Sequence, residues 1–114
     1  MGTRTASGYI RKGFLTTVTE LAILRRQIVA CAESNGVEVD AIYEEELDRN
    51  SVELVACIDA LLDADEAYLI VPSLLHFAGF NNPLEVRRDL ESRGIRVLTV
   101  RDNSQRPENR TGEE

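Results

Sequence analysis

The chain has 114 residues, of which 43% are hydrophobic and 29% are charged, and its formal net charge is −7. This length supports one domain with its own hydrophobic core, and the apolar runs are too short to span a bilayer. No apolar segment of signal-peptide type opens the sequence, so we expect a cytoplasmic protein without a membrane-spanning segment.

The charge is unevenly distributed along the chain. Residues 1–30 carry a net charge of +4, residues 31–70 carry −11, and residues 71–114 are neutral. An acidic field of this kind repels phosphate backbones, whose binding depends on Lys and Arg residues that displace counterions. The sequence therefore disfavours direct binding of DNA, and it leaves open an association with DNA through a protein partner.

Hydrophobic periodicity and capping signals predict four strands alternating with three helices. The strands are expected at residues 8–11, 37–43, 67–72 and 95–100. The helices are expected to start at a capping box in residues 17–20, at a second cap in residues 50–53, and at Asn82. The order β-α-β-α-β-α-β implies a three-layer α/β fold, with a mostly parallel four-stranded sheet and helices on both faces.

The predicted domain covers residues 8–100. Residues 1–7 are small and polar, and residues 101–114 are too poor in apolar side chains to fold alone, so both ends are predicted to be disordered. Cys31 and Cys57 lie within helical apolar patterns without metal-binding or disulfide spacing, which predicts buried, reduced thiols. No metal or cofactor is expected.

Residues 67–72 form an uninterrupted apolar run that predicts a strand covered on both faces, in the middle of the sheet. In open α/β sheets, functional groups gather beyond the carboxyl ends of the central strands. The loop at residues 73–80 is therefore where chemistry would be expected, and His76 is its one ionisable residue.

Several short segments occur in an order that matches a known family. They are Gly8-Tyr9-Ile10-Arg11, Leu24-Arg25-Arg26-Gln27, Gly36-Val37 with Ile42-Tyr43, Asp48-Arg49, and the central strand leading into Leu74. Together they resemble the catalytic domain of the serine recombinases, the resolvase and invertase family. The resemblance spans residues 8–100 and implies a resolvase-like domain.

The family cuts and rejoins DNA through a serine nucleophile, and arginines hold the scissile phosphate without a metal. The resemblance implies that Arg11, Gln27 and Arg49 occupy functional positions of the family. The nucleophile is expected two residues after Arg11, where this chain has Gly13. Because glycine has no side chain to attack with, and Thr16 is displaced along the loop, we expect no catalytic nucleophile.

A second family motif, of the Leu-Asp-Arg-x-x-Arg type, follows the third strand. In this chain Leu75 replaces the aspartate, while His76 and Gly79 replace the two arginines. The loop after the second strand is shortened to the acidic residues 44–48, which places carboxylates near the position of a phosphate. The resemblance therefore implies a degenerate member of the family.

The same loop contains more large apolar side chains than are needed to cover the end of the sheet. They belong to Leu74, Leu75, Phe77 and Phe80. We interpret these four residues, together with His76, as a candidate interface with a protein partner or a second copy of the chain. The alternative is that these residues belong to the core and that His76 is an ordinary loop histidine.

Our first functional hypothesis is a catalytically inactive serine-recombinase-like domain, regulatory or otherwise, that acts through protein–protein contacts. The second is an accessory protein in DNA recombination that binds DNA only with a recombinase partner. A basic surface around two pairs of arginines would favour it; they are Arg25, Arg26, Arg87 and Arg88.

The third hypothesis is a small-molecule enzyme that uses His76 and Arg11. A deep polar pocket beside His76 would favour this alternative.

Overall fold

The structure is a computed structural model that describes residues 4–13, 16–46, 51–78 and 82–100. Its elements are β1 (Arg4–Arg11), α1 (Val18–Ser34), β2 (Val39–Glu45), α2 (Val52–Leu62), β3 (Glu66–Val71), the 3-10 helix η1 (Leu74–Phe77), α3 (Pro83–Ser92) and β4 (Ile95–Thr99). The predicted alternation of strands and helices is confirmed. The predicted tail at residues 101–114 lies outside the described residues, as do Arg49, Gly79 and Phe80.

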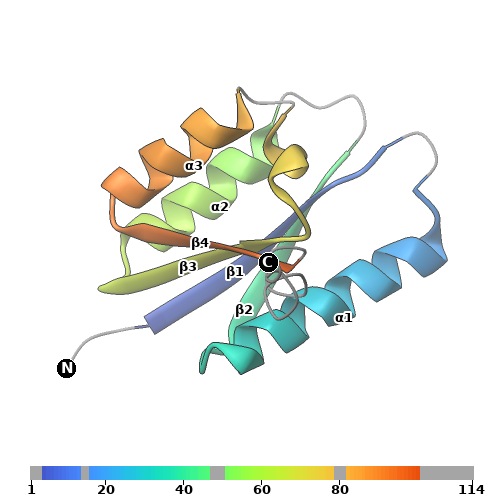
Figure 1. Cartoon of the computed structure of the whole chain (residues 1–114), viewed down its shortest axis with the longest axis horizontal. Helices are drawn as coiled ribbons and strands as arrows, with labels where there is room; N and C mark the ends of the chain where they lie inside the picture. Colours follow the sequence, from blue (N-terminus) through green and yellow to red (C-terminus); the bar gives the residue numbers. More distant parts are fainter. Residues whose placement is uncertain (1–3, 14–15, 47–50, 79–81, 101–114) are drawn as a thin grey trace, which may run out of the picture.

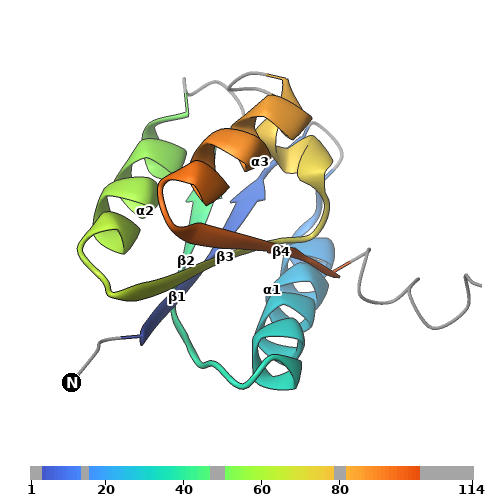
Figure 2. The same cartoon turned by 60° about the vertical axis from the view of Figure 1, so that its left-hand side comes forward.

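The four strands form one sheet in the order β2-β1-β3-β4, and every neighbouring pair is parallel. Figures 1 and 2 show α2 and α3 on one face of the sheet and α1 on the other. The predicted three-layer fold is confirmed, with β3 in the interior of the sheet. Among the described helices, none is long and apolar enough to cross a membrane.

The two faces of the sheet carry separate apolar clusters. The cluster beneath α2 and α3 contains Tyr9, Leu54, Cys57, Leu61, Leu69, Phe77, Val86, Leu90 and Val97, among others. The cluster beneath α1 contains Ala6, Ile10, Leu21, Ile28, Cys31, Ala32, Val37, Tyr68 and Ile70. Since successive side chains of a strand point to opposite faces, Tyr9 and Ile10 in β1 contribute to different clusters.

β1 begins at Arg4, four residues before the predicted start. The prediction of disorder is therefore wrong for residues 4–7. Ala6 pairs with Val39 of β2 and Tyr68 of β3, and its side chain is fully buried. Small, polar residues are weak strand formers, but pairing on both sides outweighs that local preference.

Gly8 of β1 lies in close contact with the side chain of Ile28 from α1. A Cβ atom at this position would lie 2.8 Å from Cγ2 of Ile28 and 3.2 Å from Cγ1 of Ile42. Both neighbours are β-branched side chains with restricted rotation, so they cannot easily move aside. Glycine at this position therefore permits the packing of α1 on β1.

We expect Gly8→Ala to lower the free energy of unfolding by about 1–3 kcal/mol, because the added methyl group overpacks this contact. Urea denaturation of the variant and the parent protein measures the difference. Gly13→Ala is the matched control, since among the described residues the near neighbour of its Cβ would be Oγ1 of Thr16, at an ordinary contact distance of 3.6 Å. Equal stability of Gly8→Ala and the parent protein would contradict the proposed close packing.

Two of the three predicted helix caps are confirmed. Thr17 and Glu20 form the capping box at the start of α1. The side chain of Asn82 accepts hydrogen bonds from the amides of Leu84 and Glu85 at the start of α3. The cap of α2 has a different origin, which is described below.

Both cysteines are free and buried, as predicted. Burial raises the pKa of the Cys57 thiol to about 12, although a hydrogen bond with Ser7 acts in the opposite direction. Because the thiolate is the reactive form, Cys57 is an inert part of the core at neutral pH.

Candidate functional site

The carboxyl ends of β1 and β2 meet at one edge of the sheet, and η1 follows directly after β3. Arg11, the last residue of β1, is in register with Glu45, the last residue of β2. His76 lies in η1 and contacts the end of β1. The structure therefore brings Arg11, Glu45 and His76 to the edge at which a parallel α/β sheet carries its functional groups.

His76 connects η1 to β1 through its ring. Its Nδ1 accepts a hydrogen bond from the backbone amide of Arg11, at 2.9 Å. In this arrangement Nδ1 carries no proton, and its lone pair is engaged by the main chain. His76 therefore holds the loop after β3 against the end of β1.

Glu45 is fully buried and caps α2. Its carboxylate accepts hydrogen bonds from the Tyr9 hydroxyl at 3.1 Å and from the amides of Glu53 and Leu54 at 3.1 and 3.2 Å. Ser51, at the N-cap position, has φ 61° and makes no side-chain cap. A carboxylate reaching from β2 therefore satisfies the first amides of the helix and interacts favourably with its dipole.

This arrangement corrects two predictions. Residues 44 and 45 end β2 and do not belong to an acidic loop. In the predicted cap at residues 50–53, Asn50 lies outside the described residues and Ser51 makes no side-chain cap, while Glu45 caps the helix from β2. The sequence analysis missed this role, although Glu45 lies two residues after Tyr43 and so shares its face of the strand. Burial, together with the neighbouring Glu45 carboxylate, raises the pKa of Tyr9.

Arg11 is half-buried beside Tyr9 and Glu45. Its guanidinium interacts with the Tyr9 hydroxyl and favours the ionised form of that group. Arg11 therefore lowers the pKa of Tyr9, whereas Glu45 raises it. Within the described structure, its Nη1 atom is buried without a hydrogen-bond partner. Arg11 thus keeps one buried donor atom unpaired at the carboxyl end of β1.

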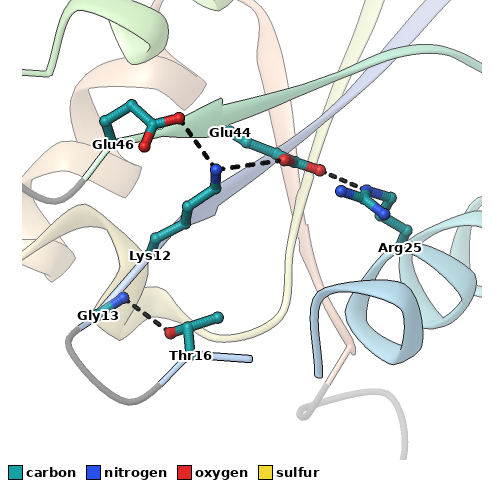
Figure 3. A network of polar contacts seen from close by, with 6 residues as sticks. All are labelled: Lys12, Gly13, Thr16, Arg25, Glu44 and Glu46. Carbon is teal, nitrogen blue, oxygen red and sulfur yellow. Dashed lines mark hydrogen bonds and ion pairs between the residues drawn. The ribbon is translucent and has the colours of Figure 1, made fainter. Parts of the chain in front are cut away.

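On the opposite face of β1, basic side chains are paired with acidic ones (Figure 3). Nζ of Lys12 lies 3.0 Å from a Glu46 oxygen and 3.8 Å from a Glu44 oxygen. Arg25 of α1 forms an ion pair with Glu44 as well. Two cations and two carboxylates leave this surface without net positive charge.

The turn after β1 is closed by Gly13 and Thr16. The amide of Gly13 donates to Oγ1 of Thr16 at 2.8 Å, and the amide of Thr16 donates to the Gly13 carbonyl at 3.2 Å. The next hydroxyl, on Thr17, accepts from the amide of Glu20 at 3.0 Å. Both threonine hydroxyls are thus used to shape the loop and the start of α1.

The Arg25 guanidinium holds the pKa of Glu44 below its usual 4.5; Lys12 acts in the same direction, and partial burial opposes them. A lowered carboxyl pKa contributes stability that is present above 4.5 and is lost as the pH falls through the folded value. We expect Arg25→Gln to move the pKa of Glu44 back toward 4.5, and to flatten the acid-side fall in stability. NMR titration of the Glu44 carboxyl measures the shift; an unchanged pKa would contradict the assignment.

The described residues of the predicted interface at 74–80 differ in how far they are buried. Phe77 is fully buried, and its ring stacks on Tyr9 with 6.3 Å between centroids. Leu74 is half-buried and packs against the same cluster. Phe77 is therefore core and not interface, because the ring fills the space between η1 and β1. Leu75 remains a surface candidate, since 71% of it is exposed.

Of the other two positions that the resemblance marks, Arg49 lies outside the described residues and Gln27 does not lie beside Arg11. Gln27 is exposed on α1, which covers the face of the sheet opposite Tyr9 and Phe77. The four arginines that would form a basic surface are also separated, because Arg25 and Arg26 lie on α1 and Arg87 and Arg88 lie on α3 (Figure 2).

Two hollows lie away from this edge. One, of about 400 Å³, runs between α2 and α3. The other, of about 460 Å³, follows β4. Neither is lined by His76 or Arg11, so neither is the polar pocket that the small-molecule hypothesis requires.

A four-stranded parallel sheet in the order β2-β1-β3-β4, covered by helices on both faces, is an α/β fold of the resolvase catalytic-domain type, and a comparison with solved structures supports this fold assignment. The chain is similar to the C-terminal catalytic domain of ISC1926 TnpA, an IS607-like serine recombinase. The TM-score is 0.60 at 15% identity, and the match covers 85% of this chain and 68% of the other. No protein-family model matches the chain, and no curated protein matches it by sequence.

Proposed function

We propose that this protein is a catalytically inactive serine-recombinase-like domain that acts through protein–protein contacts. The observation that carries the proposal is Gly13, which stands two residues after Arg11 at the end of β1. A residue without a side chain cannot supply a nucleophile, and the nearby Thr16 and Thr17 hydroxyls take part in local hydrogen bonds.

The loop after β3 supports the same conclusion. His76 stands where the family motif has an arginine, and its Nδ1 is engaged by the amide of Arg11. Leu75 stands where the motif has an aspartate, and it is exposed. Transfer of a phosphodiester needs several donors aimed at the developing charge. Among the described residues, the one buried side-chain donor atom without a hydrogen-bond partner is Nη1 of Arg11.

The ion pairs around β1 also argue against direct DNA binding. Lys12 and Arg25 are paired with Glu44 and Glu46, so they are poorly placed to displace counterions from DNA. The accessory-protein hypothesis is less favoured for the same reason, and because the four arginines lie on opposite faces of the sheet.

The experiment is a binding titration of fluorescent duplex DNA, at about 0.15 M salt. We expect no saturation at submicromolar protein, because the segment with net charge −11 must approach the phosphates. Incubation of the same protein with supercoiled and linear DNA should give no cleaved product. Submicromolar binding or cleavage would contradict the proposal.

A further inference from the structure

Helix α2 is apolar on more than the face that packs on the sheet. Leu54, Cys57 and Leu61 form its buried stripe. A second stripe, spaced by three and four residues, runs along its outer side and consists of Val52, Val55, Asp59 and Leu62. The three apolar members of that stripe are 45–48% exposed. A surface helix ordinarily carries polar residues there, so this side has the character of a contact surface.

The two middle residues of the outer stripe, Val55 and Asp59, line the groove between α2 and α3, which has a volume of about 400 Å³. The apolar side chains that line it belong to Val55, Ile58, Val86 and Leu90. Figure 2 shows the two helices side by side on one face of the sheet. A furrow between two helices has the shape that receives a third helix, through the packing of ridges into grooves.

The charged side chains of the groove are mostly acidic. Asp59 lies on α2, and Glu85 and Asp89 lie on α3. Arg93 is the groove's one cation, and it is paired with Asp89 at 3.3 Å. Among the described residues, no salt bridge neutralises Asp59 or Glu85. An occupant that pairs with these carboxylates must itself be basic.

Because this acidic rim would face its own copy in a symmetric dimer, like charges oppose a second chain as the occupant. The same carboxylates repel nucleic acid. We propose that the α2–α3 groove is a docking site for a basic amphipathic helix of another protein. The apolar stripe of that helix enters the groove, and its flanking Lys and Arg residues pair with Asp59, Glu85 and Asp89. This inference rests on the proposed function, since it names the surface and the partner chemistry for the protein contacts.

The test uses the full chain and two fluorescent helical peptides of about 18 residues, or five turns. Both peptides carry the same leucine stripe at spacings of three and four residues; the first has Lys and Arg at its other positions, and the second has Glu. We expect micromolar binding of the basic peptide in fluorescence anisotropy, and at least about tenfold weaker binding of the acidic one. Binding should weaken as salt rises from about 0.05 to 0.5 M.

Two variants of the groove locate the binding site. Val55→Glu and Asp59→Lys change exposed positions, and each should weaken binding of the basic peptide by about tenfold or more. Val18→Glu is the control, because Val18 is 82% exposed on α1, across the sheet. Circular dichroism tests whether each variant is folded. If Val55→Glu does not fold, the binding of the basic peptide to Asp59→Lys alone decides whether the groove is the binding site.

Equal binding of the two peptides, or wild-type affinity in the groove variants, would overturn the inference. A wild-type dimer in sedimentation that Val55→Glu converts to a monomer would overturn it as well, because a second copy would then fill the groove. These outcomes are independent of the DNA experiments. The docking proposal can be wrong while the proposed loss of catalysis stands, and DNA cleavage would contradict the loss of catalysis without bearing on peptide binding.

Discussion

Phe77→Ala is expected to destabilise the domain by about 3–5 kcal/mol, the range for removing a large aromatic side chain from a packed core. The ring is fully buried and stacks on Tyr9, so its loss removes apolar burial and leaves a cavity between η1 and β1. Denaturant unfolding followed by circular dichroism measures the change.

Leu75→Ala is the matched control for this prediction. Leu75 lies in the same 3-10 helix, but 71% of it is exposed. Its truncation should change the free energy of unfolding by about 0.5 kcal/mol or less. A Phe77→Ala variant as stable as Leu75→Ala would show that the η1 segment is not part of the core.

Glu45→Ala is expected to cost about 2–4 kcal/mol, because it removes the cap of α2 and leaves buried donors without acceptors. These donors are the Tyr9 hydroxyl and the amides of Glu53 and Leu54. Thermal unfolding should show a clearly lowered midpoint.

Glu46→Ala is the control for the cap, since Glu46 is the next residue and its side chain is 60% exposed beside Lys12. Its loss should have little effect, as is usual for exposed ion pairs. If Glu45→Ala and Glu46→Ala have the same midpoint of thermal unfolding, Glu45 does not cap α2.

The order and layering of the fold could be predicted from periodicity, because the apolar runs and two of the helix caps are local signals. The start of β1 could not, since Ala6 and Ser7 are weak strand formers that become buried through pairing with β2 and β3. Strand boundaries depend on neighbours that are distant in sequence.

Two errors at the candidate site have physical causes. Three consecutive glutamates have the composition of a solvated loop, yet alternation along β2 places Glu45 on the face of Tyr43 and Tyr9. A run of apolar loop residues does not distinguish core from interface, because burial of Phe77 depends on Tyr9 lying opposite it. The hydrogen bond between His76 and Arg11 likewise joins segments 65 residues apart.

We propose that this domain does not cut DNA, and Gly13 allows a direct test. Among the described residues, a Cβ atom at this position would have Oγ1 of Thr16 as its near neighbour, at 3.6 Å, which is an ordinary van der Waals contact, so we expect Gly13→Ser to be tolerated. The measurement is denaturing electrophoresis of the wild type and of Gly13→Ser after incubation with a pool of randomised supercoiled and linear DNA.

We predict no covalent protein–DNA adduct for either protein. Serine alone would not restore the two arginines whose positions, by the resemblance to the family motif, are taken here by His76 and Gly79. An adduct formed by the wild type would contradict the proposed loss of catalysis. An adduct formed by Gly13→Ser alone would show that the rest of the catalytic site is intact.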